Sequence, residues 1–166
     1  TNKNLLIIKN KSLIQHAIDF SLKLNVDKII FSSDSEGYFN SLENVSKISF
    51  HKRKNKSSND NATDFDVIEE LFSRNFISKS DIIIWLRPTS PIRNKEECRK
   101  ALKMFKDNPQ FNSLRSVQKV KQHPYWMKEL KDNNNLKEFI EKKNEGNFPN
   151  SQSLPSLYYP SCEFDL

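Results

Sequence analysis

The sequence of 166 residues is poor in the residue types that build common catalytic motifs, with two glycines, two cysteines and three histidines. Gly37 and Gly146 lie outside any strand–loop–helix phosphate cradle, which excludes the Walker A and dinucleotide-binding fingerprints. The dispersed histidines match no metal spacing, which argues against a zinc enzyme, and no nucleophile elbow supports hydrolase chemistry. Cys98 and Cys162 form neither a metal-binding spacing nor a disulfide framework.

Long hydrophobic runs are also missing. No segment approaches the length of a transmembrane helix and no signal peptide is visible, so we expect a cytoplasmic protein with no membrane partner. A hydrophobic fraction of 36% with 12 Phe residues favours a folded chain, and we expect a single domain over 1–166. Because Thr1 is followed almost at once by an apolar run, we also expect sequence to be missing upstream.

Basic residues outnumber acidic residues by 27 to 21, which gives a formal net charge of +6. Three explanations are open: a nucleic-acid-binding surface, a basic site for anionic substrates, or lysines scattered over a solvated surface. The last is supported by the fact that 21 of the 27 basic residues are Lys. Because the chain has no recognised nucleic-acid-binding module and no aromatic–basic stripe on one element, we expect no nucleic-acid partner.

Apolar runs alternate with amphipathic segments over the first two thirds of the chain. The expected strands cover 5–8, 28–33, 46–50, 81–86 and 113–118, and the expected helices cover 13–24, 35–43, 64–76 and 95–105. This alternation predicts right-handed βαβ units and a mainly parallel sheet in an α/β fold. From residue 121 onward the pattern breaks down, and we expect 122–157 to be an excursion that serves as a substrate lid or a subunit contact.

The expected helices have explicit caps and apolar stripes. Ser12 and Asn94 stand at N-cap positions. Helical spacing places Phe65, Leu71 and Phe72 on the apolar face of the third helix, and it places Cys98 on that of the fourth as a small core residue.

Polar side chains follow the expected strands where each one ends. The strand over 81–86 runs into Leu86–Arg93 (LRPTSPIR), which has two prolines, two hydroxyls and two arginines and offers little to a core. Because the carboxyl ends of parallel strands meet at one edge of a sheet, where open α/β folds bind ligands, the groups after these strands should share a crevice. The candidate residues are Asp34, Arg53, Asp60, Arg87, Thr89, Ser90 and Arg93.

Chemistry and structure both explain these candidates. Arginines bind phosphate or carboxylate bidentately, and hydroxyls and loop amides bind the edge of a base or a sugar. The structural alternatives are that Asp34 caps the next helix, that Arg53 is solvated surface, and that Arg93 pairs with Glu96 or Glu97.

Short motifs in a fixed order connect these candidates to a family. They are Lys3-Asn4, Leu13–Ile18 (LIQHAI), Ser32–Glu36 (SSDSE), Arg53, Asp60–Thr63 (DNAT) with Asp66–Ile68 (DVI), Leu86–Arg93, and His123–Lys128 (HPYWMK). Each motif is weak alone, but in this order and spacing they cover residues 3–160, and the chain resembles the acylneuraminate cytidylyltransferases. The resemblance implies a three-layer, mainly parallel, Rossmann-like sheet of the nucleotide-diphospho-sugar transferase type.

The resemblance also implies a reaction. These enzymes make CMP-sialic acid and related sugars: an acidic nine-carbon sugar attacks the α-phosphate of CTP through its anomeric hydroxyl and pyrophosphate leaves. Positioning and charge neutralisation, by Mg²⁺ and basic side chains, carry such a transfer. The expected cofactor is therefore Mg²⁺, although its ligands are not identified in this sequence.

Roles carry over to this sequence position by position. The expected catalytic residues are Lys3, Asn4 and Arg87; the nucleotide-binding residues are Asn4, Arg53, Asp60, Thr89 and Ser90; the sugar-binding residues are Arg87, Arg93, Gln152 and Tyr159. Lys3 and Asn4 would form the tail of the nucleotide-phosphate loop. Arg87 stands where many members have a Gln that faces the sugar, and an Arg there suggests a different acidic sugar, bound through its carboxylate.

Three departures from the family pattern stand out. The Gly- and Arg-rich loop expected before Lys3 and the acidic metal-binding cluster expected after Leu166 lie outside the sequence. Ser151-Gln152 replaces an expected Arg-Gln pair, and Ser161-Cys162 replaces an expected Asn-Gly pair. Cys cannot adopt the backbone conformations of Gly without strain.

The leading hypothesis is a homodimeric cytidylyltransferase seen as a fragment of a longer or degraded reading frame. The excursion 122–157 is the expected dimer contact, because apolar residues such as Phe139, Phe148, Leu154 and Leu157 would otherwise have little to cover them. The alternative is a catalytically inactive, truncated homologue that binds a nucleotide or a partner.

Overall fold

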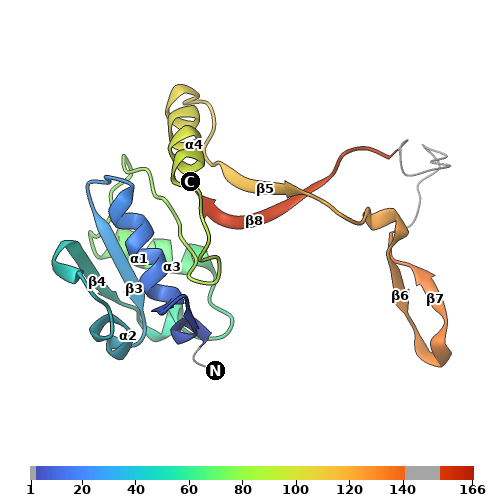
Figure 1. The fold of residues 1–166 in the computed structure, drawn as a ribbon, viewed down its shortest axis with the longest axis horizontal. Helices are drawn as coiled ribbons and strands as arrows, with labels where there is room; N and C mark the ends of the chain where they lie inside the picture. The colour runs from blue at the N-terminus through green and yellow to red at the C-terminus, as the bar shows by residue number, and fades with distance from the viewer. Residues whose placement is uncertain (1–2, 141–153) are drawn as a thin grey trace. The chain divides into compact units, whose positions relative to one another are not determined.

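The computed structural model describes residues 3–140 and 154–166, which form a mixed α/β fold (Figure 1). The chain divides into two compact units, residues 1–115 with 162–166 and residues 116–161. The α-helices are α1 (Leu13–Lys23), α2 (Glu36–Asn40), α3 (Asp64–Ser73) and α4 (Lys95–Asp107). The strands are β1 (Ile7–Ile8), β2 (Lys11–Ser12), β3 (Ile29–Ser33), β4 (Ile48–Lys52), β5 (Arg115–Lys119), β6 (Lys128–Leu130), β7 (Leu136–Glu138) and β8 (Tyr158–Asp165). The 3₁₀ turns are η1 (Lys3–Leu5), η2 (Val45–Lys47), η3 (Asn55–Ser57), η4 (Pro124–Trp126) and η5 (Asp132–Asn134).

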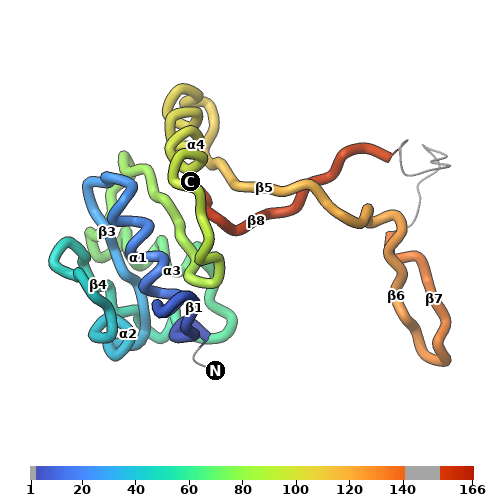
Figure 2. Tube along the Cα trace, in the orientation of Figure 1, coloured from blue at the N-terminus to red at the C-terminus, as the bar shows by residue number. Residues whose placement is uncertain are grey.

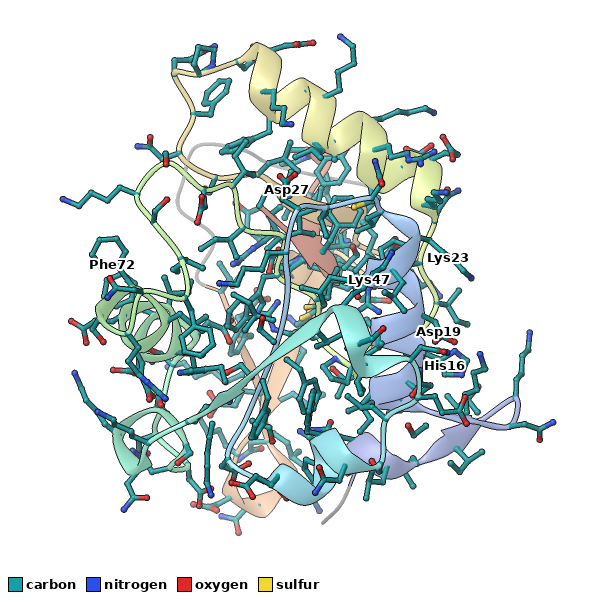
Figure 3. The ribbon with its side chains drawn as sticks, turned by 90° about the vertical axis from the view of Figure 1, so that its left-hand side faces the viewer. His16, Asp19, Lys23, Asp27, Lys47 and Phe72 are labelled. Atoms are coloured by element: carbon teal, nitrogen blue, oxygen red, sulfur yellow. The ribbon has the colours of Figure 1, made fainter. Side chains whose placement is uncertain are left out.

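The centre of the first unit is the parallel pair of β3 and β4. Its register runs from Ile29 opposite Ile48 to Ser33 opposite Lys52. Figure 3 shows α1, which carries the labelled Asp19, on one side of this pair and α3 on the other. Because side chains alternate along a strand, one face of the pair packs on each helix.

The face toward α1 is apolar. Ile14 and Ile18 of α1 form a buried cluster with Leu42 and Ile48. Phe31 packs against this cluster, and it belongs to a set of stacked rings with Phe39 and Phe50. This cluster anchors β3 and β4 to the helix that precedes them.

The expected caps of α1 and α4 are confirmed. The Ser12 hydroxyl accepts a hydrogen bond from the Gln15 N–H at 3.2 Å. Asn94 Oδ1 accepts from the N–H groups of Glu96 and Glu97 at 2.9 and 3.3 Å. Cys98 is 1% exposed, as its place on the apolar stripe predicts.

The apolar face of α3 differs from the expectation. The helix begins with a capping box between Thr63 and Asp66. Val67 and Leu71 are buried, whereas Phe65 is 71% exposed and Phe72 is 41% exposed. The predicted burial of Phe65 and Phe72 is therefore wrong, because the buried stripe of α3 consists of Val67 and Leu71, one turn apart, and both Phe residues lie off it.

The prediction of a strand over 81–86 is also wrong, although apolar side chains of this segment pack against a core cluster. Residues 81–87, whose path can be followed in Figure 2, form no strand and make a single bridge, Trp85 to Asp165. Ile84 and Leu86 pack against a buried cluster of Phe20, Leu24, Cys98 and Phe164. The segment is only partly buried, with Ile82 41% exposed, and a strand also needs neighbours for its backbone groups.

The sheets are consequently small. Among residues 3–140 and 154–166 every sheet is two-stranded: β3 pairs with β4 in parallel, β1 with β2 and β6 with β7 pair antiparallel, and β5 pairs with β8. No large parallel sheet forms in this part of the chain. In the same described residues, none of the helices has both the length and the apolar character needed to cross a bilayer.

The second unit contains an antiparallel hairpin. β6 and β7 pair in register from Lys128 opposite Glu138 to Leu130 opposite Leu136. His123 caps η4 by accepting from the Tyr125 N–H at 3.2 Å. Leu130 and Leu136 are 65% and 68% exposed. The role of 122–157 as an excursion for a lid or a dimer contact stays a prediction.

Cys162 adopts a left-handed backbone conformation with φ of 59° inside β8. A Cβ is disfavoured there, by roughly 1–2 kcal/mol. We expect Cys162→Gly to be more stable than Cys162→Ala, which keeps the Cβ without the thiol, by about 1 kcal/mol in urea unfolding. Equal free energies of unfolding for the two variants would contradict this account of the strain.

Glu70 links α3 to the loop after β4. Its carboxylate accepts from the Lys54 N–H at 3.1 and 3.2 Å, from Arg74 Nη1 at 3.0 Å and from the Ser57 hydroxyl. Burial favours the neutral acid, but these hydrogen bonds outweigh it and lower the pKa of Glu70 from 4.5 to about 2.

A carboxylate with a lowered pKa stabilises the folded state above its unfolded pKa, and this contribution is lost as the pH falls from 4.5 toward 2. We expect Glu70→Gln to reduce the free energy of unfolding at pH 7 by about 2–3 kcal/mol and to flatten its decline in that window. Glu69→Gln is the matched control, because Glu69 pairs with Lys56 at an exposed position. Urea unfolding at pH 7 and pH 3 measures both, and wild-type acid sensitivity in Glu70→Gln would refute the assignment.

Candidate functional site

Arg53 is fixed at the carboxyl ends of β3 and β4. Its backbone N–H donates to the Ser33 carbonyl at 2.9 Å, which continues the parallel ladder by one residue. Its guanidinium donates from Nε to Ser32 Oγ at 2.9 Å and from Nη2 to the Ser32 carbonyl at 3.0 Å. The alternative that Arg53 is merely solvated surface is therefore wrong.

A buried histidine lies behind Arg53. His51 is 0% exposed, and its Nδ1 lies 2.9 Å from Ser32 Oγ. Its Nε2 lies 3.5 Å from Glu70 Oε1, and its ring contacts the edge of Phe76. Burial lowers the pKa of His51, partly offset by the Glu70 carboxylate, so the imidazole is neutral near pH 7.

Carboxylates surround Arg53. Burial lowers the pKa of Arg53, while the charges of Asp34, Asp64 and Glu70 act in the opposite direction. A guanidinium stays charged under such shifts. Among the residues that the structure describes, none forms a hydrogen bond with Arg53 Nη1, so this edge can accept a ligand.

Arg87 lies in a second group of charges, which shares Asp64 with the carboxylates that act on Arg53. Its Nη1 donates to Asp165 Oδ2 at 2.7 Å and its Nη2 pairs with Asp64. Arg115 Nε donates to the other oxygen of Asp165 at 3.1 Å. Burial alone would lower the pKa of Arg87, but these carboxylates raise it. Both Nη atoms are thus engaged, and a substrate carboxylate would have to replace one of the two partners.

Arg93 forms its hydrogen bonds with backbone groups of the protein itself. Its Nε donates to the Glu163 carbonyl at 2.5 Å, its Nη2 donates to the Arg87 carbonyl, and its guanidinium lies over the ring of Phe20. Burial lowers the pKa of Arg93 to about 10. The alternative pairing with Glu96 or Glu97 is not found, because these carboxylates pair with Arg99 and Lys100. Arg93 ties the loop after residue 86 to β8.

The remaining predicted residues lie at several places. Lys3 and Asn4 are in η1, and Asp60 is exposed in the loop before α3. Thr89 is exposed in a turn closed by the Ser90 N–H and the Arg87 carbonyl at 3.1 Å, with Pro88 preorganising its first bend. Tyr159 is in β8 within the second unit and is 40% exposed. Gln152 lies outside the described residues.

The charges of Asp34 and Asp64 both act on Arg53, and Asp64 also forms an ion pair with Arg87. The N-cap of α2 is Ser35, so Asp34 does not cap that helix. Their functional roles stay predictions.

Five residues that interact with Arg53 or Arg87 were not predicted as site residues from the sequence: Ser32, His51, Asp64, Glu70 and Asp165. A signal existed for His51, since it lies two residues before Arg53 and so shares a strand face with it. No signal pointed to Asp165, because it meets Arg87 across 78 positions of sequence.

The described residues do not fit a magnesium site. Within them, no cluster of three or more His, Cys, Asp or Glu side chains could hold a metal ion. Asp64 and Asp165 both face arginine, so their negative charge is already balanced. Mg²⁺ needs oxygen ligands that are not committed to cations.

Comparisons with known proteins identify the family of the chain. An N-acylneuraminate cytidylyltransferase of Streptococcus agalactiae serotype V is 29% identical over 164 residues, which cover 96% of this chain and 38% of that protein. Its namesake from S. agalactiae serotype III matches to the same extent, and the one from Escherichia coli O18:K1:H7 is 26% identical over 83% of this chain and 32% of its own length. The chain thus spans well under half the length of these curated relatives. Since residues 1–165 match the family described as Cytidylyltransferase, the chain belongs to the cytidylyltransferase family.

Proposed function

We propose that the protein containing this chain transfers CMP from CTP to an acidic nine-carbon sugar of the sialic acid type and releases pyrophosphate. The observation that carries the proposal is Arg53, whose guanidinium is held at the carboxyl ends of two parallel strands with Nη1 available. Open α/β folds bind ligands at this edge, and guanidinium groups suit phosphate oxygens. The names of the relatives, N-acylneuraminate cytidylyltransferases, support the sugar class.

In this reaction the anomeric oxygen of the sugar bonds to the α-phosphorus of CTP. The bond from that phosphorus to the oxygen bridging the β-phosphate breaks, and pyrophosphate carries away the electron pair. The chain contributes position and positive charge: Arg53 would hold the phosphates, and Lys3 and Asn4 would lie beside them as the tail of the phosphate loop.

Carboxylates and hydroxyls of the site suit the rest of the nucleotide. The exposed Asp60 would accept hydrogen bonds from ribose hydroxyls or from the cytosine amino group. Thr89 and Ser90, in the turn after Arg87, would line the strand-end part of the cleft.

Arg87 is the proposed contact to the sugar. A sugar carboxylate would take the place of Asp64, the more exposed of its two partners, with side-chain exposures of 51% for Asp64 and 15% for Asp165. Asp165 would then keep the guanidinium oriented. Arg93 would support this position through the Arg87 carbonyl, and Gln152 and Tyr159 would contribute further sugar contacts.

The proposal extends to architecture. We propose a single cytidylyltransferase domain over 1–166 with the three-layer, Rossmann-like sheet of nucleotidyltransferases, in which 122–157 forms the contact of a homodimer. This layering is supported by the parallel pair of β3 and β4, with Arg53 at its carboxyl ends, and by the helices on both sides of the pair (Figure 3). The family typically depends on Mg²⁺, but the residues that the structure describes offer no site for it, so no step of the proposal is assigned to the metal.

Turnover tests the reaction. We expect the chain, incubated with CTP, Mg²⁺ and a panel of nonulosonic acids, to release pyrophosphate with at least one sugar, and release should require both CTP and that sugar. CTP binding without release for any sugar would contradict the transferase and support the nucleotide-binding alternative. Absence of CTP binding by the folded chain would contradict both.

Arg53 tests the location of the nucleotide. We expect Arg53→Met to weaken CTP binding about tenfold, because a charged hydrogen bond to phosphate contributes roughly 1.5–3 kcal/mol. Arg99→Met is the matched control, since Arg99 is an exposed arginine of α4 that pairs with Glu96. Calorimetric titration with CTP measures both variants, and equal losses in the two would show a nonspecific charge effect instead.

A further inference from the structure

His51 is a buried histidine to which the proposed reaction gives no role. It is 0% exposed and lies between Ser32 of β3 and Glu70 of α3, 2.9 Å from Ser32 Oγ and 3.5 Å from Glu70 Oε1. Arg53 follows two residues later and uses the same Ser32 hydroxyl. A buried polar side chain is a candidate positioning residue when it contacts the residue that holds a proposed ligand-binding side chain.

One direction of this network is fixed by chemistry and the other depends on the tautomer of His51. Arg53 Nε can only donate, so Ser32 Oγ accepts from it. The Ser32 hydroxyl still has its own hydrogen to donate, and His51 Nδ1, 2.9 Å away, is the acceptor when the imidazole is protonated on Nε2. A neutral His51 that accepts at Nδ1 carries its proton on Nε2, which faces the Glu70 carboxylate.

We propose that His51 is a positioning residue for nucleotide binding. By accepting at Nδ1 it turns the Ser32 hydroxyl so that the oxygen faces Arg53 Nε, and this holds the guanidinium with Nη1 directed away from the strand ends toward the nucleotide phosphates. The inference rests on the proposed function, because it assumes that Arg53 meets CTP.

The network would raise affinity by ordering the Arg53 side chain before the nucleotide binds. A free arginine side chain has many rotamers, and ordering it upon binding reduces affinity. Ser32 holds two of the three guanidinium nitrogens, Nε through its hydroxyl and Nη2 through its carbonyl. The carbonyl is fixed by the backbone, but the hydroxyl rotates unless something accepts its hydrogen. His51 is that acceptor when its proton is on Nε2, and the Glu70 carboxylate, 3.5 Å from Nε2, favours that tautomer by its charge.

Variants of the network test the inference through CTP affinity. His51→Phe keeps a buried ring but removes the acceptor, and Ser32→Ala removes the hydroxyl without touching the histidine. We expect each to weaken CTP binding about five- to tenfold in calorimetric titration. His51→Asn should stay within about twofold of wild type, because its amide oxygen can accept near the place of Nδ1. His16→Phe is the control, since His16 bonds the Ile8 carbonyl outside the network.

The coupling to Arg53 separates positioning from general damage. In an Arg53→Met background, His51→Phe should cause no further loss of CTP affinity. An equal loss in both backgrounds, or unchanged affinity in the folded His51→Phe and Ser32→Ala variants, would overturn the proposal. Circular dichroism of each variant identifies those that are folded, and Ser32→Ala keeps the test decisive if His51→Phe does not fold.

A ligand-free measurement distinguishes this inference from the proposed function. ¹⁵N NMR of the histidine rings in the wild-type chain should show His51 with protonated Nε2 and unprotonated Nδ1 near neutral pH. A proton on Nδ1 would overturn the positioning inference whatever CTP does. The expected tautomer together with no CTP binding would instead overturn the proposed function and, with it, the nucleotide role of His51.

Discussion

The parallel pairing of β3 with β4 is the constraint on which the site depends. Its register places Ser32 directly beside His51 and lets the backbone of Arg53 continue the ladder to Ser33. The two faces of this strand pair pack against different parts of the protein. One face packs Phe31 and Phe50 against the apolar cluster under α1, and the other places Ser32 and His51 against α3. A slip of one residue would exchange the faces and bury the wrong set.

Charge balance shapes the rest of the site. Asp64 is shared between the surroundings of Arg53 and an ion pair with Arg87, and Asp165 joins Arg87 to Arg115. Glu70 stays ionised because hydrogen bonds lower its pKa to about 2. The excess of basic residues in the sequence therefore does not produce an open cationic surface here. It supplies arginines that are held in place, Arg87 by carboxylates and Arg53 by Ser32, which suits recognition of anionic groups in defined positions.

Local sequence signals predicted local structure well. The caps Ser12 and Asn94 and the buried Cys98 follow from helical periodicity and side-chain chemistry within a few residues, and all three are confirmed. The same reasoning predicted that polar groups after the strands converge, and this stays a prediction, although the charge of Asp64 acts on Arg53 and Asp64 also pairs with Arg87. The replacement of a family glycine by Cys162 pointed to backbone strain, which its φ of 59° bears out.

Contacts between distant segments were not predictable in this way. The ion pair of Arg87 with Asp165 depends on how β8 returns to residue 85, and no local pattern encodes that meeting. The apolar segment 81–86 is hydrophobic enough for a strand, but pairing depends on neighbours rather than on its own composition.

The central claim is that CTP binds at the carboxyl ends of β3 and β4. Amide chemical-shift mapping of the isotope-labelled chain during a CTP titration tests it most directly. The account predicts saturable shifts concentrated at residues 32–34 and 51–53, with residues 128–138 of the β6–β7 hairpin unchanged. Shifts centred on that hairpin, or no shifts at the strand ends at saturating CTP, would contradict it.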